Sequence, residues 1–231
     1  MHIVQKILLA GLLALTVYAF WPRDNDQVPA IEQWQMAVER SGSTRFMGVV
    51  LGEATFADVQ LRFDEPGEVA VFARKDSAEE PQLEVFFDDL PDDGRMILNL
   101  DAGPEMVEKI IRAGYRPVIL PDGTVRFGVP PEFVGEVRRL KVNGITFLPP
   151  VRLDRKSFEA VYGKAAANVS TGDGNLHLLY PELGLDFIRS EEGVDILQLV
   201  PLSEYEKLVA PLKKALLDHE LNSQQPEQQQ P

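Results

Sequence analysis

Few side chains of this chain are of the types that carry out acid–base or nucleophilic chemistry. The sequence contains His2, His177 and His219, and it contains no cysteine. A Ser-His-Asp relay needs an imidazole that the fold brings to a serine and an acid, and a histidine metal centre needs several imidazoles together, whereas His2 and His219 lie close to the two ends of the chain. No Gly-x-Ser-x-Gly elbow, phosphate loop or dinucleotide-binding fingerprint occurs. We therefore predict a protein that is not an enzyme and that holds no cofactor and no metal.

His177 is the one histidine inside the region expected to fold. It lies between Leu176 and Leu178 in an alternating pattern, which predicts a strand with this side chain at the solvent face or at a sheet edge. A hydrolase that uses acidic residues and His177 remains a third hypothesis, behind two non-enzymatic ones.

The densest group of carboxylates is Asp88, Asp89, Asp92 and Asp93. Calcium loops alternate their ligands with spacer residues and end in a bidentate glutamate, and this run does neither. The corresponding connection later in the chain carries a single acid, Glu182. We predict a solvated turn, with a weak cation site as the alternative.

Composition and charge limit the partners. The formal net charge is -13 at pH 7, which makes nucleic acid and anionic lipid surfaces poor partners. The absence of cysteine excludes disulfide bonds and a lipid-modified cysteine anchor.

An apolar run from Ile7 to Trp21 predicts export across the inner membrane. Lys6 precedes it and Asp24 follows it closely, so the lysine end is expected to stay cytoplasmic and the rest of the chain to reach the periplasm. One alternative is a retained anchor over residues 3–21. The other is a signal peptide cleaved near Ala19, giving a protein secreted to the periplasm.

The flanking regions are expected to contribute little core. Residues 22–44 are predicted to form an extended linker and a short amphipathic helix over Ile31 to Arg40. Residues 222–231 are rich in glutamine and proline and predict a disordered tail.

Between these ends, residues 45–144 and 145–221 follow one pattern and predict two related modules. Thr55 and Asp154 are both suited to cap a helix. Val59 with Phe63, and Phe158 with Tyr162, then fall four residues apart on one helix face. Strands and a closing helix follow in the same order, with these matched pairs: Leu83–Leu90 and Leu176–Leu183; Gly94–Leu100 and Gly193–Leu199; Glu108–Ile111 and Glu206–Val209.

The segment between the modules predicts further antiparallel strands. Pro117 to Leu120 and Thr124 to Gly128 flank a Pro-Asp-Gly turn, and Asn143-Gly144 is a hairpin-type pair. Helices and antiparallel strands segregate locally, so the predicted fold class is α+β. The stretch from Leu202 to Leu217 predicts a helix that packs on the sheet and that Pro211 bends or interrupts.

A capped helix followed by a short antiparallel sheet resembles the small α+β modules of bacterial envelope proteins, namely the SmpA/OmlA outer-membrane assembly lipoproteins (the BamE-like group) and the β-lactamase-inhibitor-protein-like fold. The residues that carry the resemblance are Thr55, Val59, Phe63 and Pro66 in the first module, and Asp154, Phe158, Tyr162 and Gly163 in the second. In the family the helix is followed by Gly-x-Pro. Asp64 stands at the position of this glycine in the first module, and Ala165 stands at the position of this proline in the second. The resemblance implies a module that binds other proteins through its sheet face and loops.

The first functional hypothesis is therefore a membrane-tethered periplasmic protein that binds or scaffolds other envelope proteins. The alternative is a carrier or sensor of a small apolar ligand held between helix and sheet. Aromatic and leucine side chains at strand ends and on the last helix give a candidate partner or ligand groove. Its residues are Trp34, Phe87, Tyr180, Leu183 and Tyr205.

Overall fold

The computed structural model describes residues 34–74, 80–88, 90, 94–171, 174–190 and 193–213. The predicted anchor or signal peptide, the predicted tail, and Asp89, Asp92 and Asp93 of the acidic turn lie outside the described residues. Within the described part, no helix combines the length and apolar character needed to span a membrane.

A small antiparallel sheet opens the described chain. It consists of β1 (Met36–Val38), β2 (Thr44–Phe46) and β3 (Val49–Val50), in that order. The helix predicted over Ile31 to Arg40 is wrong at β1, because Met36 pairs with Phe46 across the ladder and Trp34 is buried against Phe147. These tertiary contacts override a weak helical pattern.

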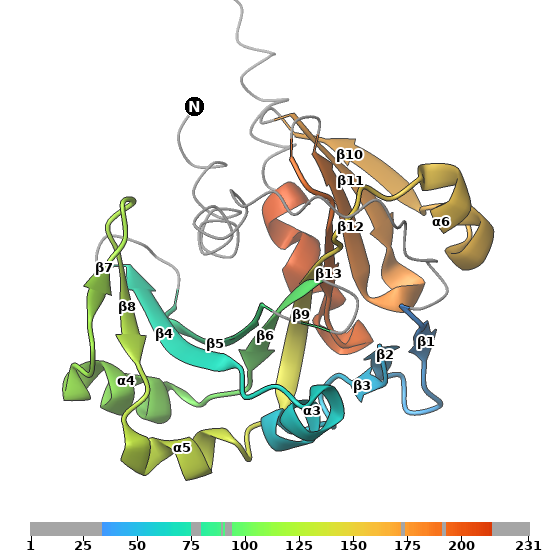
Figure 1. The fold of residues 1–231 in the computed structure, drawn as a ribbon. Helices are drawn as coiled ribbons and strands as arrows, with labels where there is room; N and C mark the ends of the chain where they lie inside the picture. The colour runs from blue at the N-terminus through green and yellow to red at the C-terminus, as the bar shows by residue number, and fades with distance from the viewer. Residues whose placement is uncertain are drawn as a thin grey trace, which may run out of the picture.

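The rest of the strands form one antiparallel sheet of ten, drawn in Figure 1. In sheet order they are β10 (Ala167–Ser170), β11 (Asn175–Tyr180), β12 (Leu185–Ser190), β13 (Ile196–Leu199), β9 (Val142–Leu148), β6 (Arg95–Leu100), β5 (Gln82–Phe87), β4 (Glu68–Arg74), β8 (Thr124–Gly128) and β7 (Val118–Ile119). The predicted α+β class is confirmed.

The order of the strands divides the sheet into two halves that meet at its centre. The first half contains the meander β4-β5-β6 and then β9, and the second half is the meander β10 to β13. They are joined because β9 pairs with β13, with Phe147 opposite Leu197. In Figure 1 the sheet bends between the two halves, so that it forms a trough.

A helix precedes each half, and both predicted N-caps are confirmed. α3 (Phe56–Phe63) has a capping box, in which the Thr55 amide donates to Asp58 Oδ2 at 2.8 Å and the Asp58 amide donates to Thr55 Oγ1 at 3.3 Å. α6 (Arg155–Tyr162) begins after Asp154, whose carboxylate accepts from the Ser157 amide at 2.9 Å. Capping satisfies amides that have no partner inside the helix.

One of the predicted correspondences does not hold in the sheet. The pattern predicts that Gly94–Leu100 corresponds to Gly193–Leu199, but β6 pairs with β5, whereas β13 pairs with β12 and not with β11. The strand beside β11 is β12, which follows the short 3₁₀ turn Pro181–Leu183. Because only this short turn separates β11 from β12, the alternating pattern did not indicate the additional strand.

The two predicted turns of the middle segment have different outcomes. The β7–β8 hairpin is confirmed, with Ile119 opposite Val125. The Asn143-Gly144 turn is wrong, since both residues lie inside β9, where the pairing with β6 shifts register between Asn99 and Leu100. An Asn-Gly pair in a strand can mark a bulge instead of a turn.

The other helices in the described part of the chain are α4 (Pro104–Ala113), α5 (Pro131–Val137) and a C-terminal helix over residues 205–213, which follows the 3₁₀ turn Leu202–Glu204. The C-terminal helix continues through Pro211 to residue 213, so Pro211 does not interrupt it there.

The two faces of the sheet carry different side chains. One face holds the main core, in which Phe56, Val59 and Phe158 of the helices pack against alternate strand residues such as Leu98 and Phe187. The other face carries a smaller apolar cluster, comprising Phe86, Ile97, Leu148, Ile188 and Ile196, with Phe72 packed against it. Polar side chains share this second face, and they form the site described next.

Candidate functional site

A row of polar residues crosses the second face of the sheet. Direct cross-strand partners lie on the same face of a sheet. Glu84 of β5 pairs with Asn99 of β6, and farther along Gln198 of β13 pairs with both Thr146 of β9 and Asp186 of β12. Each half of the sheet thus contributes polar groups to one row.

A cavity of about 790 Å³ opens above part of this row. Its polar floor includes Asn99, Gln198 and Asp186, and Gly144, opposite Asn99, adds no side chain there. Apolar side chains of α4 and of the C-terminal helix also line it, namely Val107, Ile111, Leu208, Pro211 and Leu212, and Val107 is at the same time part of the main core. The cavity therefore lies between two helices and the sheet, with contrasting chemistry at its floor and walls.

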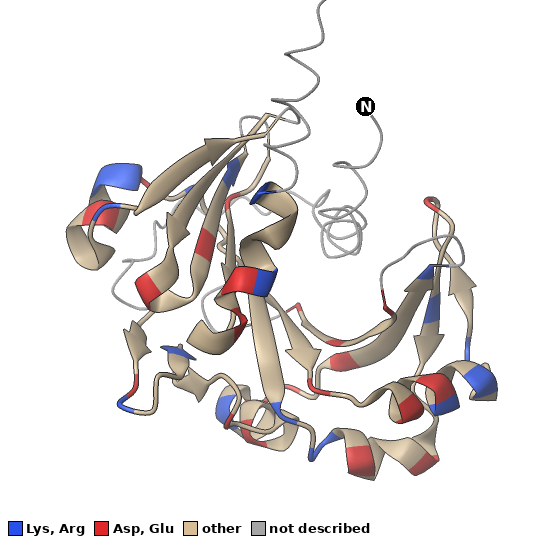
Figure 2. Cartoon of the chain, turned by 180° about the vertical axis from the view of Figure 1, so that it is seen from behind, with Lys and Arg blue, Asp and Glu red and all other residues tan. Residues whose placement is uncertain are grey.

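The charge around the cavity is strongly acidic. The acidic residues that line it are Glu80, Asp101, Glu108, Asp186 and Glu204, and the single basic one is Lys207. The Lys207 ammonium already lies 2.6 Å from the Glu204 carboxylate. Figure 2 shows acidic residues on both flanking helices. The lining therefore favours cations and neutral molecules over anions.

Asp186 is the most buried of these acids. Its side chain is 2% exposed, and its Oδ2 lies 2.7 Å from Nδ1 of His177. Its second oxygen, Oδ1, has no hydrogen-bond partner within the described part of the chain. Burial raises the pKa of Asp186, while the hydrogen bond to His177 and the charge of His177 oppose that change. A buried acceptor that lacks a partner is costly, so Oδ1 is a position where a ligand donor would be stabilised.

Tyr205 lies beside this carboxylate, at the start of the C-terminal helix. Burial, together with the negative charges of Asp186 and Glu206, raises the pKa of its hydroxyl. The phenol therefore stays neutral.

The predicted position of His177 is wrong. The side chain is fully buried, and β11 lies between β10 and β12 instead of at an edge of the sheet. Its Nε2 has no hydrogen-bond partner among the described residues. A ring with no exposed atom is poorly placed to exchange a proton with a substrate, and we interpret the His177–Asp186 pair as a support for the cavity floor.

Glu84 is the corresponding buried group in the first half. Burial raises its pKa to about 8, because a low-dielectric surrounding disfavours the charged form. Its Oε2 has no hydrogen-bond partner in the described chain. Glu84 is next to Asn99 in the polar row, but it is not among the residues that line the cavity.

Four of the five residues of the predicted groove are buried in the interior, and Leu183 is partly buried. Trp34 contacts Phe147 with ring centroids 5.2 Å apart, Phe87 contacts Phe56 at 6.3 Å, and Tyr180 contacts Phe158 at 5.7 Å. Leu183 packs against the same core, and Tyr205 is buried on the opposite face near Asp186. None of the five is among the residues that line the cavity.

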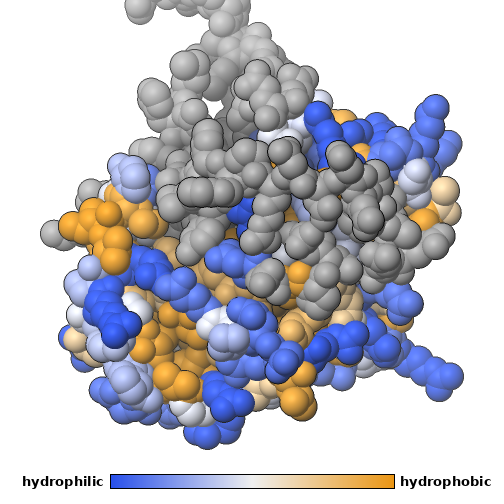
Figure 3. Space-filling model, in the orientation of Figure 1, coloured by the Kyte–Doolittle hydropathy of each residue, from blue (hydrophilic) through white to orange (hydrophobic). Residues whose placement is uncertain are grey.

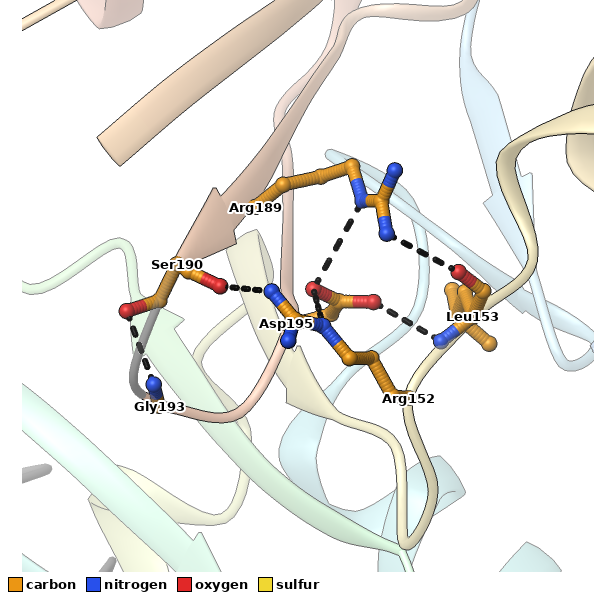
Figure 4. Close-up of polar contacts among 6 residues, drawn as sticks. All are labelled: Arg152, Leu153, Arg189, Ser190, Gly193 and Asp195. Atoms are coloured by element: carbon orange, nitrogen blue, oxygen red, sulfur yellow. Dashed lines mark hydrogen bonds and ion pairs between the residues drawn. The ribbon is translucent and has the colours of Figure 1, made fainter. Parts of the chain in front are cut away.

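A second polar cluster, shown in Figure 4, surrounds Asp195 at the start of β13. Its carboxylate accepts a hydrogen bond from the Leu153 amide at 2.7 Å, and it lies 3.9 Å from Nε of both Arg152 and Arg189. Arg152 also donates to the Ser190 carbonyl. Burial raises the pKa of Asp195, and the Leu153 hydrogen bond and the two arginines oppose that change. These contacts fasten the segment before α6 to the second half of the sheet.

An exposed apolar group lies at the β7 end of the sheet. Val118 and Ile119 of β7 are 46% and 77% exposed, and apolar surface covers the β7–β8 region at the left of Figure 3. β7 is the last strand in the order and pairs only with β8. An edge strand with exposed apolar side chains is open to pairing with another chain.

Among the described residues, no three His, Cys, Asp or Glu side chains are arranged to hold a metal ion. Comparison with family models, with curated proteins and with solved structures finds no match for this chain.

Sequence reasoning missed Asn99, Gln198 and Asp186, although a signal for them was present. Each is a single polar residue between apolar neighbours: Leu98-Asn99-Leu100, Leu197-Gln198-Leu199 and Leu185-Asp186-Phe187. Such an alternation predicts that the polar residues of a strand share one face. What it lacks is the strand order, which brings the three onto one floor.

Proposed function

We propose that this protein is a non-enzymatic binding protein of the cell envelope, whose described region holds a small amphipathic ligand. The observation that carries the proposal is the cavity of about 790 Å³ between α4, the C-terminal helix and the polar row of the sheet. Its volume falls within the range of about 300–1,000 Å³ that is usual for small-molecule sites.

The two-sided lining supports an amphipathic ligand. Val107 and Ile111 of α4 line the cavity together with Leu208 and Leu212 of the C-terminal helix, and burying an apolar chain against them removes its surface from water. At the floor, the ligand's polar end meets Asn99, Gln198 and Asp186, which fix its orientation through hydrogen bonds.

Blocking the cavity tests this proposal. Leu208 lies in the cavity wall and is partly exposed, so that Leu208→Trp fills the space without removing core volume. Leu61 on α3 is 85% exposed and does not line the cavity, so Leu61→Trp is the matched control. Each protein is incubated with envelope lipid extract and measured by native mass spectrometry. A bound small molecule is expected in the wild type and in Leu61→Trp, but not in Leu208→Trp. Equal occupancy in all three proteins contradicts the proposal.

The location in the envelope rests on the apolar run from Ile7 to Trp21. A retained anchor over residues 3–21 would hold the binding region at the periplasmic surface of the inner membrane. The mass of the mature protein distinguishes the anchor from the alternative, which is cleavage near Ala19 and release into the periplasm.

A second candidate function is binding of an envelope protein, and the exposed edge strand β7 favours it. An extended segment of a partner would add to this edge by main-chain hydrogen bonds, with Val118 and Ile119 supplying apolar contacts. Cross-linking in intact cells from position 119 is expected to capture one defined partner. Recovery of monomer alone would count against this candidate.

The two halves of the sheet are, on this proposal, copies of one helix-plus-sheet module. α3 and α6 each span 8 residues and begin at caps 99 positions apart, Thr55 and Asp154. β5 and β11 each span 6 residues, and both lie second in a meander. Equivalent spacing in both helix and strand supports a common origin of the halves.

A further inference from the structure

The charges and the free acceptor in the cavity select a class of ligand. We propose that the ligand is a cationic amphiphile, a molecule with an ammonium group that binds Asp186 and an apolar chain that lies along the two flanking helices. This inference rests on the proposed function of the cavity and goes beyond it by assigning the ligand's charge.

Asp186 supplies the anchoring acceptor. It is 2% exposed and lines the cavity, and His177 occupies only its Oδ2. Its Oδ1 has no partner among the described residues. An ammonium carries three donors and no acceptor, so it would satisfy this oxygen by a charge-assisted hydrogen bond, which is stronger than a neutral one.

A second acceptor lies directly beside it. Gln198 pairs with Asp186 across β12 and β13, so the two side chains emerge on the same face. The Gln198 side chain also lines the cavity, and its amide oxygen can accept a second ammonium hydrogen. Neighbouring acceptors on two rigid strands fix the position of the ammonium more sharply than one carboxylate would.

The remaining charges reinforce this preference. Glu80, Asp101, Glu108 and Glu204 add negative charge around the cavity, and Lys207 is engaged by Glu204. A carboxylate ligand, such as a fatty acid, would bring like charge toward a buried acid and is therefore disfavoured. The same apolar walls accept the hydrocarbon part of either molecule, so the head group decides between them.

The test compares three ligands with the same chain and different head groups. n-Hexylamine, n-hexanol and sodium hexanoate are titrated at pH 7 into the full chain in lipid nanodiscs, with protein-free nanodiscs as the blank, and heats are measured by calorimetry. Hexylamine is expected to bind roughly tenfold more tightly than hexanol, and hexanoate more weakly than hexanol.

Two variants that each remove one negative charge test whether Asp186 causes the preference for hexylamine over hexanol. Asp186→Asn is expected to remove the tenfold advantage of hexylamine over hexanol. Glu105→Gln removes the same charge from an exposed position of α4 that does not line the cavity, and is expected to keep the advantage, because solvent screens exposed charges.

The results separate the two levels of inference. Hexanoate binding as tightly as hexylamine, or an undiminished amine preference in Asp186→Asn, overturns the cationic ligand and leaves the cavity as a binding site. Binding of none of the three ligands by the wild type overturns the proposed cavity function as well. If Asp186→Asn does not fold, the order of the three ligands on the wild type decides the inference.

Discussion

The two halves of the ten-stranded sheet bury an ionisable side chain at the same place and stabilise it in different ways. Glu84 and His177 are each the third residue of a six-residue strand, β5 and β11, and each strand is second in its meander. His177 has a carboxylate partner, Asp186, at 2.7 Å. Glu84 has no partner for its Oε2 in the described chain, and burial raises its pKa to about 8.

The difference shows two physical answers to one problem. A buried ionisable group either acquires a partner or becomes neutral. The first half leaves Glu84 close to neutral at pH 7, and the second half forms a pair. Forming this pair requires that the second half bury the Asp186 carboxylate. The same carboxylate provides Oδ1, the acceptor from which we infer the ligand's charge.

The largest expected effect comes from β9, the strand through which the first half pairs with the second. Phe147 of β9 is fully buried and contacts Trp34 and Phe46, with centroids 5.2 and 5.3 Å apart. Phe147→Ala is expected to reduce the free energy of unfolding by about 3–5 kcal/mol, since it leaves a cavity in the core. Urea unfolding followed by circular dichroism measures the loss. Because β9 pairs with both β6 and β13, one transition is expected, and two separate transitions would mean that the halves unfold independently.

Glu84→Gln is expected to change the pH dependence of stability. The pKa of Glu84 is about 8 in the folded protein and 4.5 as its ordinary value, so the folded state binds more protons between these values and loses stability as pH rises from about 4.5 to 8. The variant lacks this titration. Its free energy of unfolding, relative to that of the wild type, is therefore expected to rise by up to about 3 kcal/mol between pH 4.5 and pH 7. Urea midpoints at a series of pH values measure it. Parallel curves for the two proteins would show that Glu84 does not titrate in this range.

His177→Leu, at the corresponding position of the second half, is expected to lower stability at pH 7, whereas Glu84→Gln raises it. It removes the partner of Asp186 Oδ2, and an unsatisfied buried acceptor costs about 1–3 kcal/mol. The urea midpoint at pH 7 is therefore expected to fall. As pH decreases, Asp186 becomes protonated and no longer a buried charge, so the deficit is expected to shrink. If the variant is as stable as the wild type at pH 7, His177 does not stabilise the buried Asp186 carboxylate, and the proposed difference between the halves is wrong.

The smallest expected effect concerns a feature that the halves share. Thr55→Ala removes a reciprocal capping box from α3 and is expected to cost about 1 kcal/mol. Asp154→Ala removes the cap of α6, where the carboxylate accepts from the Ser157 amide and hydroxyl, and is expected to lower the thermal midpoint as well. Thermal unfolding measures both. A midpoint unchanged in either variant would indicate that packing alone holds that helix.

The parts predicted from sequence are those that local chemistry determines. Thr55 and Asp154 were identified as caps, and the strands of β5, β6 and β11 were located, because capping and apolar alternation act over a few residues. The parts that failed depend on distant partners. Residues 36–38 form β1 because β2 lies beside them, and the Asn143-Gly144 pair stays inside β9 because β6 and β13 flank it.

The sequence by itself therefore determined the α+β class, the two capped helices and the shortage of catalytic side chains among its residues. Only the tertiary structure decided the neighbours of each strand. Asn99, Asp186 and Gln198 are separated by as many as 99 positions, and strand order alone places them on one floor beneath two helices. The same order buries His177 between two strands and pairs it with Asp186. Burial and charge depend on what surrounds a side chain, and no local pattern contains that information.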